Sequence, residues 1–252
     1  MTLAYARSLT GRERTHRANK QLGWMLAFVA GAINAGGFLA VQQYTSHVTG
    51  MVSSVADNLA LGQLGLVVDG LVAVLAFLLG AICCALMVNY ARRHRLSSEY
   101  ALPLLLEAAL ILAFGLLGSQ LASYETLLVP ATVLVLCFIM GLQNAVVTKL
   151  SHGVVRTTHL TGTVTDLGIE LGKLLYWNRD PSAPEPVLAN RERMLVLGVM
   201  VLSFLGGGIV GAFGFKWLGY VFTVPLAVLL AALAAVPLMD DLQRAAAARR
   251  RT

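Results

Sequence analysis

Charged side chains are scarce in this sequence, and it contains only three cysteines. Asp, Glu, Lys and Arg make up 13% of its 252 residues, whereas 57% are hydrophobic, and the mean hydropathy is +0.72. A soluble domain of this length could not bury so much apolar surface. Cys83, Cys84 and Cys137 show no paired spacing, so we interpret them as small packing residues rather than disulfide or metal ligands.

Motifs for catalysis are also missing. No His-x-x-x-His or paired-cysteine spacing occurs, and no Gly-rich phosphate loop or nucleophile–base pair stands out. We therefore expect no metal and no cofactor, and a membrane enzyme is the weakest alternative. The formal charge of +6 would suit nucleic acid. However, the basic residues lie between apolar runs, as in a membrane protein, so nucleic acid is not an expected partner.

Long apolar runs dominate the rest of the sequence. A helix needs about 20 residues to cross a bilayer. The stretch before the first run has no small-residue cleavage site, so that run is interpreted as a retained helix and not as a signal peptide. The predicted full spans are Leu22–Val41, Leu64–Tyr90, Ala101–Leu117, Leu127–Leu150, Met194–Phe213 and Gly219–Met239.

Two shorter apolar stretches, Thr49–Leu61 and Thr161–Leu175, are interpreted from the distribution of Lys and Arg. If both are half-length and the N-terminus is inside, 18 of the 19 Lys and Arg residues are inside and Lys216 is outside. If Thr49–Leu61 crossed fully, the cluster at Arg92, Arg93 and Arg95 would move outside. Short cytoplasmic loops are enriched in Lys and Arg, so the half-length interpretation is favoured.

The predicted fold is therefore an all-α polytopic membrane protein with six full transmembrane helices and two re-entrant half-helices. Each half has three full spans, an odd number, so the halves form an inverted repeat. We expect a basic cytoplasmic tail at residues 1–20, a first repeat at 21–118, a second repeat at 127–239 and a basic cytoplasmic tail at 240–252. The expected location is a bacterial inner membrane.

Two pairs of similar strings support the repeat. Residues 45–50 read Thr-Ser-His-Val-Thr-Gly, and residues 157–162, 112 positions later, read Thr-Thr-His-Leu-Thr-Gly. Residues 31–35 read Gly-Ala-Ile-Asn-Ala, and residues 141–145, 110 positions later, read Gly-Leu-Gln-Asn-Ala. A Thr-Gly turn used only as a helix cap and packing contact is the alternative interpretation.

In the re-entrant arrangement the N-termini of the two short helices face each other near mid-membrane. Their free N–H groups and helix dipoles favour an anion or an electron-rich polar solute. The histidines could donate hydrogen bonds to such a solute or could simply bond to nearby backbone. The predicted binding residues are Asn34, His47, Thr49, Gly50, Asn144, His159, Thr161 and Gly162.

Three carboxylates are candidates for coupling transport to a proton or cation. Glu107 lies within an apolar span, where a charge facing lipid would cost at least about 2.5 kcal/mol, so it must face the interior, be protonated or pair. Gln143, Asn144, His47 and Arg156 are its candidate partners. Asp57 and Asp166 lie on the short helices, where either coupling or a position near the membrane surface would explain them.

The sequence resembles the YoaK family of bacterial inner-membrane proteins. The second half carries the family's Gly141-Leu142-Gln143-Asn144-Ala145 string and its Thr-Thr-x-x-Thr-Gly-Thr string at residues 157–163. The first half departs from it, because Asn34 stands where the family has an acid and Met51 stands where Asn is usual. The layout also resembles a reduced core of sulfate-permease and nucleobase transporters, in which facing half-helix N-termini bind substrate.

We expect a transporter of a small polar or anionic solute that binds at mid-membrane between the two half-helix ends. A passive channel and a non-transporting scaffold or accessory protein are the alternatives. The lipid bilayer and the solute are the expected partners. A second copy of the chain is a further candidate, because Gly207 and Gly211 in the fifth span allow close packing within the monomer or against another subunit.

Overall fold

The computed structural model describes residues 16–96, 98–121, 123–151, 158–178 and 186–249. These residues form helices and connecting loops and contain no strand. Arg156, Thr157, most of the N-terminal tail and residues 250–252 lie outside the described part. In chain order the helices are α2 (His16–Val41), α3 (Val48–Ala60), α4 (Leu64–Arg93), α5 (Ala101–Gln120), α6 (Glu125–Leu150), α7 (Leu160–Leu175), α8 (Arg191–Leu218), the 3₁₀ helix η1 (Gly219–Phe222) and α9 (Thr223–Arg249).

Each predicted span coincides with one long helix, and the two shorter stretches coincide with α3 and α7. By length and hydropathy, five segments of the described residues qualify as membrane spans, and the last, Arg191–Gln243, contains α8, η1 and most of α9. Its 53 residues exceed what one crossing of about 30 Å requires at about 1.5 Å per residue. The chain breaks at Gly219, whose φ of 62° lies in the left-handed region, so α8 and α9 are separate helices.

Large apolar side chains cover the outside of the bundle. On α4 the exposed residues include Leu71, Leu75 and Leu86, and on α8 they include Leu202 and Leu205. Only 22% of the most apolar stretch of α4 is buried inside the molecule. A surface this apolar marks a protein that contacts lipid, so the chain is a membrane protein.

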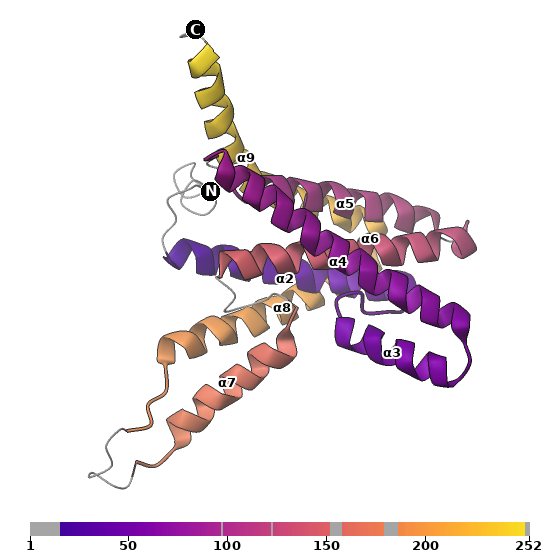
Figure 1. Cartoon of the computed structure of the whole chain (residues 1–252), viewed down its shortest axis with the longest axis horizontal. Coiled ribbons are helices and arrows are strands. Elements are labelled where there is room, and N and C mark those ends of the chain that lie inside the picture. The colour runs from indigo at the N-terminus through magenta and orange to yellow at the C-terminus, as the bar shows by residue number, and fades with distance from the viewer. Residues whose placement is uncertain (1–15, 97, 122, 152–157, 179–185, 250–252) are drawn as a thin grey trace.

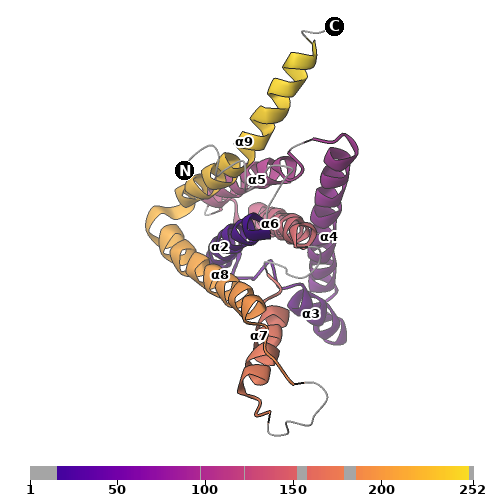
Figure 2. The ribbon, with the colours of Figure 1, turned by 90° about the vertical axis from the view of Figure 1, so that its left-hand side faces the viewer.

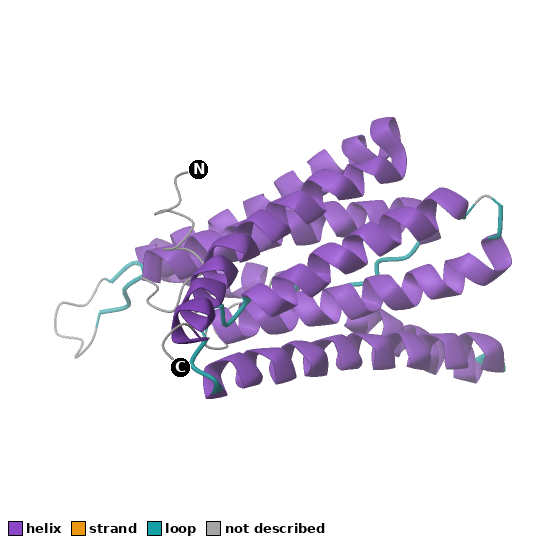
Figure 3. Cartoon of the chain, turned by 90° about the horizontal axis from the view of Figure 1, so that it is seen from above, coloured by secondary structure: helices purple, strands orange, loops and turns teal. Residues whose placement is uncertain are grey.

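The helices are arranged around a central pair. Figure 2, which looks along the bundle, shows α2 and α6 at the centre, with α8 and α4 on either side. In the same view α5 and α9 lie above the pair, and α3 and α7 lie below it. The long helices run side by side in Figure 3, and the last part of α9 leaves the bundle in Figure 1. The buried core includes Leu22, Leu104, Leu136 and Leu230.

Four copies of a Phe-x-x-Gly motif make the two closest helix crossings. The motifs begin at Phe28 in α2, Phe77 in α4, Phe138 in α6 and Phe204 in α8. At the α2–α8 crossing, a Cβ at Gly31 would overlap the carbonyl oxygen of Phe204. In the same way, a Cβ at Gly207 would overlap the carbonyl oxygen of Phe28. The α4–α6 crossing has the same reciprocal contact. Only glycine allows backbones to approach so closely, so the repeat in the sequence is also a repeat in the packing.

The directions of the crossing helices follow from contacts near their ends. Lys20 pairs with Glu192, which joins the first turns of α2 and α8. Lys149 donates to Asn89 over 3.2 Å, which joins the last turns of α6 and α4. The Phe-x-x-Gly motifs give each pair a second contact, which comes later in the sequence of α2 and α8 and earlier in the sequence of α4 and α6. Helices α2 and α8 therefore run in one direction together, and α4 and α6 run together.

The central pair is antiparallel. Gln143, late in α6, donates to the carbonyl of Leu26, early in α2, over 3.2 Å. Leu136, earlier in α6, lies beside Gly37, near the end of α2. Since α4 runs parallel to α6, it runs opposite to α2, and the chain leaves α2 and enters α4 at the same end of the bundle. The segment that contains α3 therefore starts and finishes at that end. By the same reasoning, the segment with α7 starts and finishes at the other end.

Candidate functional site

The two His-x-Thr-Gly strings form the same local structure. His47 is the last residue before α3, and His159 is the last residue before α7. Each imidazole folds over the glycine three residues later, so a Cβ at Gly50 or Gly162 would overlap the Nδ1 side of its ring. The glycine is therefore needed because the histidine ring occupies the space of a side chain. The sequence analysis named these four residues as solute-binding residues, and the structure places each glycine against the ring of its own histidine.

An asparagine holds the residue before each histidine. Ser46 donates to Oδ1 of Asn34 over 2.8 Å. In the second half, Nδ2 of Asn144 donates to the hydroxyl of Thr158 over 2.5 Å, and the backbone N–H of Thr158 donates to Oδ1 of Asn144 over 3.2 Å. These bonds tie α2 to the start of α3 and α6 to the start of α7. Asn34 and Asn144 thus position the two helix ends.

The first turns of α3 and α7 have free backbone donors. Among the described residues, none accepts a hydrogen bond from the N–H groups of residues 48–50 or 160–162. Thr49 and Thr161 stand at the second position of their helices and are exposed. Figures 1 and 2 show the N-terminal ends of α3 and α7 pointing toward one another on one face of the α2–α6 pair. Free N–H groups and the helix dipole give each end partial positive charge.

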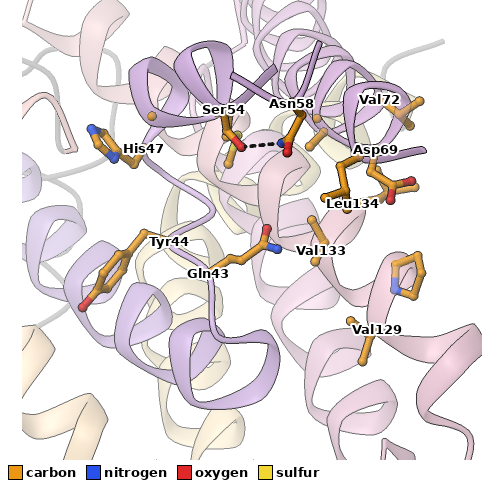
Figure 4. Close-up of a pocket in the computed structure, with 16 residues that line it drawn as sticks. Gln43, Tyr44, His47, Ser54, Asn58, Asp69, Val72, Val129, Val133 and Leu134 are labelled. Atoms are coloured by element: carbon orange, nitrogen blue, oxygen red, sulfur yellow. Dashed lines mark hydrogen bonds between the residues drawn. The ribbon is translucent and has the colours of Figure 1, made fainter. Parts of the chain in front are cut away.

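A cavity of about 540 Å³ leads along α3 to its first turn. Its walls are the α2–α3 connection, α3, the first part of α4 and the first half of α6. His47 and Gly50 line one part of it, and Asn58 and Asp69 line another. Figure 4 shows His47 and Asp69 on opposite sides, with Gln43 pointing into the space between them. The cavity therefore gives access to the free donors of α3.

Glu107 of α5 is fully buried against the central pair. Its Oε1 accepts from Nε2 of Gln143 over 2.7 Å, and the same Nε2 approaches the carbonyl of Leu26. Oε2 of Glu107 and Oε1 of Gln143 have no partner among the described residues. Of the predicted partners, Gln143 is found, no bond joins Glu107 to Asn144 or His47, and Arg156 is not described. Gln143 and Asn144 are consecutive in α6, so Glu107 and the start of α7 contact neighbouring residues of one helix.

Ion pairs join α7 to α8. Arg193 donates to Asp166 over 2.9 Å and lies 3.7 Å from the buried carboxylate of Glu170. Glu170 also accepts from the N–H of Asn190 over 2.8 Å and from Lys173 over 3.0 Å. These bonds, the N–H of Asn190 first, lower the pKa of Glu170 below its ordinary value. Asp166 therefore has a structural partner in Arg193, and its predicted coupling role stays a prediction.

Asp57 is exposed on α3 and does not line the cavity. The carboxylate that does line it, Asp69, was not among the predicted site residues. The signal was present in the sequence, because Asp69 is the one acidic residue in the apolar run Leu64–Tyr90. Within the described residues, no group of three His, Cys, Asp or Glu side chains is placed to hold a metal ion.

Comparisons with known proteins identify the family. Residues 22–236 match the family described as "Protein of unknown function (DUF1275)". The UPF0700 transmembrane protein YoaK of Bacillus subtilis (strain 168) is 28% identical over 160 residues, which cover 62% of this chain and 68% of that protein. No solved structure matches. Since the family match covers most of the chain, the protein belongs to the DUF1275 family of membrane proteins and is a relative of YoaK.

Proposed function

We propose that this protein is a transporter that moves a small polar or anionic solute, bound at mid-membrane between the N-terminal ends of α3 and α7. The observation that carries the proposal is the cavity of about 540 Å³, which reaches His47 and Gly50 at the first turn of α3. Unpaired backbone N–H groups inside a bilayer are tolerated where they line a cavity. At such a helix end the donors and the dipole together favour an electron-rich group.

The proposed topology has six full spans and two re-entrant half-helices, α3 and α7, with both termini in the cytoplasm of a bacterial cell. Helices of 13 and 16 residues rise about 20 and 24 Å, less than the hydrocarbon core of about 30 Å. The helix directions support this arrangement, because α3 and α7 each lie in a segment that returns to its starting end. The matching crossings of α2 with α8 and of α6 with α4 support an inverted repeat.

The structure fits an outward-facing state of such a transporter. The cavity runs along α3, in the half that opens to the outside in this topology. The corresponding cleft between α7 and α8 is instead bridged by Arg193, Asp166 and Glu170. Alternating access would open that bridge and close the cavity as one repeat rocks against the other.

Glu107 is the proposed coupling group, with a proton as the coupling ion. A buried carboxylate without a cationic partner is costly, whereas a protonated carboxyl group can donate a hydrogen bond. Two acceptors, Oε2 of Glu107 and Oε1 of Gln143, lack partners, and a single proton on Glu107 would supply a donor there. Proton release would then alter the contact with Gln143, which adjoins the asparagine that holds the start of α7.

Flux into proteoliposomes tests the transport proposal. The solutes are radiolabelled formate, acetate, sulfate, phosphate and urea, which span small anions and a neutral polar compound. For any solute that shows saturable uptake, Thr49→Val and Thr161→Val should each lower the apparent affinity about tenfold or more. Loss of one hydrogen bond to a charged group is worth about 1.5–3 kcal/mol, and 1.4 kcal/mol is a factor of ten. Valine leaves the backbone N–H groups in place, so unchanged uptake in both variants would exclude the two threonine hydroxyls as solute ligands.

Thr165→Val is the matched control, since it removes a threonine hydroxyl one turn further along α7 that bonds only to the backbone carbonyl of Thr161 over 2.8 Å.

A second variant, Glu107→Gln, separates a carrier from a channel. A proton-coupled carrier should lose uphill uptake and keep downhill exchange, whereas a passive channel would show unsaturated downhill flux at every pH. No flux of any of the five solutes would count against transport and favour the scaffold interpretation.

A further inference from the structure

We propose that the cavity between α3, α4 and α6 binds a small organic cation, with Asp69 as its counter-ion. This inference goes beyond the proposed function, because it assigns a ligand of defined charge to the outer part of the cavity, and equilibrium binding there needs no transport. The site uses Asp69, Asn58 and Ser54, none of which contributes to the predicted solute site at the helix ends.

Asp69 is the only Asp, Glu, Lys or Arg among the 16 residues that line the cavity. Its carboxylate makes no hydrogen bond or ion pair with any residue that the structure describes. Asp69 stands in the second turn of α4, is exposed, and lines the cavity. The charge that would neutralise it is not supplied by a described side chain, so a ligand can supply it.

The second half of the molecule shows what occupies the equivalent place. With the 112-residue offset between α3 and α7, Ser54 corresponds to Asp166 and Asn58 corresponds to Glu170. In the second half the guanidinium of Arg193, from the neighbouring α8, lies 2.9 Å from Asp166 and 3.7 Å from Glu170. A cationic group therefore fills the cleft between the short helix and the long helix that follows it.

In the first half, no described Lys or Arg takes the corresponding place. The motifs at Phe77 and Phe204 are 127 residues apart, so the counterpart of Arg193 on α4 is the apolar Leu66. In the second half the acidic residues lie on the short helix α7, whereas in the first half the acidic residue Asp69 lies on the long helix α4, about one turn after Leu66. The cleft keeps an acid and two polar side chains but contains no Lys or Arg, and it is open as a cavity. We infer that a free cation takes the place that Arg193 takes in the other half.

The cavity size and lining define the ligand further. The whole cavity, which includes the part beside His47 and Gly50, has a volume of about 540 Å³, within the range of roughly 300–1,000 Å³ found for small-molecule sites. Asn58 donates through Nδ2 to Ser54 over 3.1 Å, which leaves its Oδ1 free to accept from the ligand. Val72, Val129 and Val133 provide an apolar wall. An ammonium or guanidinium group on a short alkyl chain satisfies both surfaces.

Isothermal titration calorimetry on the full-length protein in lipid nanodiscs at pH 7 tests the inference. The probes are n-butylammonium and ethylguanidinium, with 1-pentanol and pentanoate as neutral and anionic compounds of similar size. We expect saturable binding of at least one of the two cations and no binding of 1-pentanol or pentanoate. Asp69→Asn should weaken cation binding at least tenfold, whereas Asp69→Glu should retain it.

Glu99→Gln is the matched control, because it removes a carboxylate beside Arg92 at the opposite end of α4 and should leave binding unchanged. Val133→Trp should abolish binding by filling the cavity without changing its charge. Thermal unfolding of each variant establishes that it is folded. Equal binding of n-butylammonium and 1-pentanol, or equal binding by wild type and the folded Asp69→Asn variant, would overturn the inference. Cation binding without solute flux would support this site while counting against the proposed transport.

Discussion

Replacing Gly207 by alanine should destabilise the protein strongly, whereas the same change at the adjacent Gly206 should not. A Cβ at Gly207 would lie 2.7 Å from the carbonyl carbon of Phe28 and would overlap its oxygen. Ordinary contact begins near 3.4 Å, so clearing the carbon alone requires α8 to move about 0.7 Å away from α2, and clearing the oxygen requires more. Overpacking of this kind costs about 1–3 kcal/mol. A Cβ at Gly206 meets nothing within 4 Å.

The two variants differ only in which face of α8 receives one methyl group. Because alanine is the better helix former by about 1 kcal/mol, Gly206→Ala should be neutral or slightly stabilising. The measurement is thermal unfolding in detergent, followed by circular dichroism, on both variants and the wild type. Gly141→Ala, at the α6–α4 crossing, should repeat the Gly207→Ala result, because its Cβ would lie 2.7 Å from the carbonyl carbon of Phe77.

The crossing also sets the candidate site. Asn34 follows Gly31 by one turn of α2, and Asn144 follows Gly141 by one turn of α6, so a shifted crossing displaces the residue that holds each short helix. Gly207→Ala should therefore reduce solute flux as well as stability. If Gly206→Ala and Gly207→Ala lowered the unfolding temperature equally, the reciprocal Phe-x-x-Gly contact would be refuted.

Two further predictions concern stability and accessibility. Glu170→Gln should lower the unfolding temperature at pH 7, and the difference from wild type should shrink in acid. The pKa of Glu170 lies below the ordinary value of about 4.3, so its carboxylate stabilises the fold above that pH and loses this effect as the pH falls through the lowered pKa. A difference that does not depend on pH would contradict the assignment. In detergent, a small maleimide should modify the partly exposed Cys83, and modification of the buried Cys84 and Cys137 should require unfolding, which mass spectrometry of the labelled protein would show.

The sequence predicted the helices well because apolar runs of different length are separated by polar or glycine-containing breaks. The short stretch Thr49–Leu61 became α3 at Val48–Ala60, and Thr161–Leu175 became α7 at Leu160–Leu175. The repeated strings also located both helix starts. Such features are local, since a helix start depends on residues within one or two turns.

Partners across the bundle were harder to predict, because periodicity shows which face of a helix is apolar but not which helix covers it. Gly207 was expected to pack closely, but only the structure shows that it packs against Phe28 of α2 within the same chain. Asp166 was interpreted as a coupling or surface residue, and its contact with Arg193 depends on how α7 lies on α8. Asp69 could have been found from its isolation in an apolar run.

The differences between the two halves bear more directly on function than the likenesses do. The helix crossings, the asparagines and the histidine–glycine pairs are shared by both halves, so they account for the scaffold of the proposed inverted repeat. Asp69 beside its cavity belongs to the first half, the ion pairs of Arg193 belong to the second, and the Glu107–Gln143 contact joins α5 of the first half to α6 of the second. If the halves were equivalent, neither face of the membrane would be favoured for opening. In the proposed alternating-access mechanism, the ion pairs between α7 and α8 and the cavity beside α3 would both favour an outward-facing state. A solute or cation that binds at α3 would stabilise that state, and breaking the Arg193 bridge would oppose it.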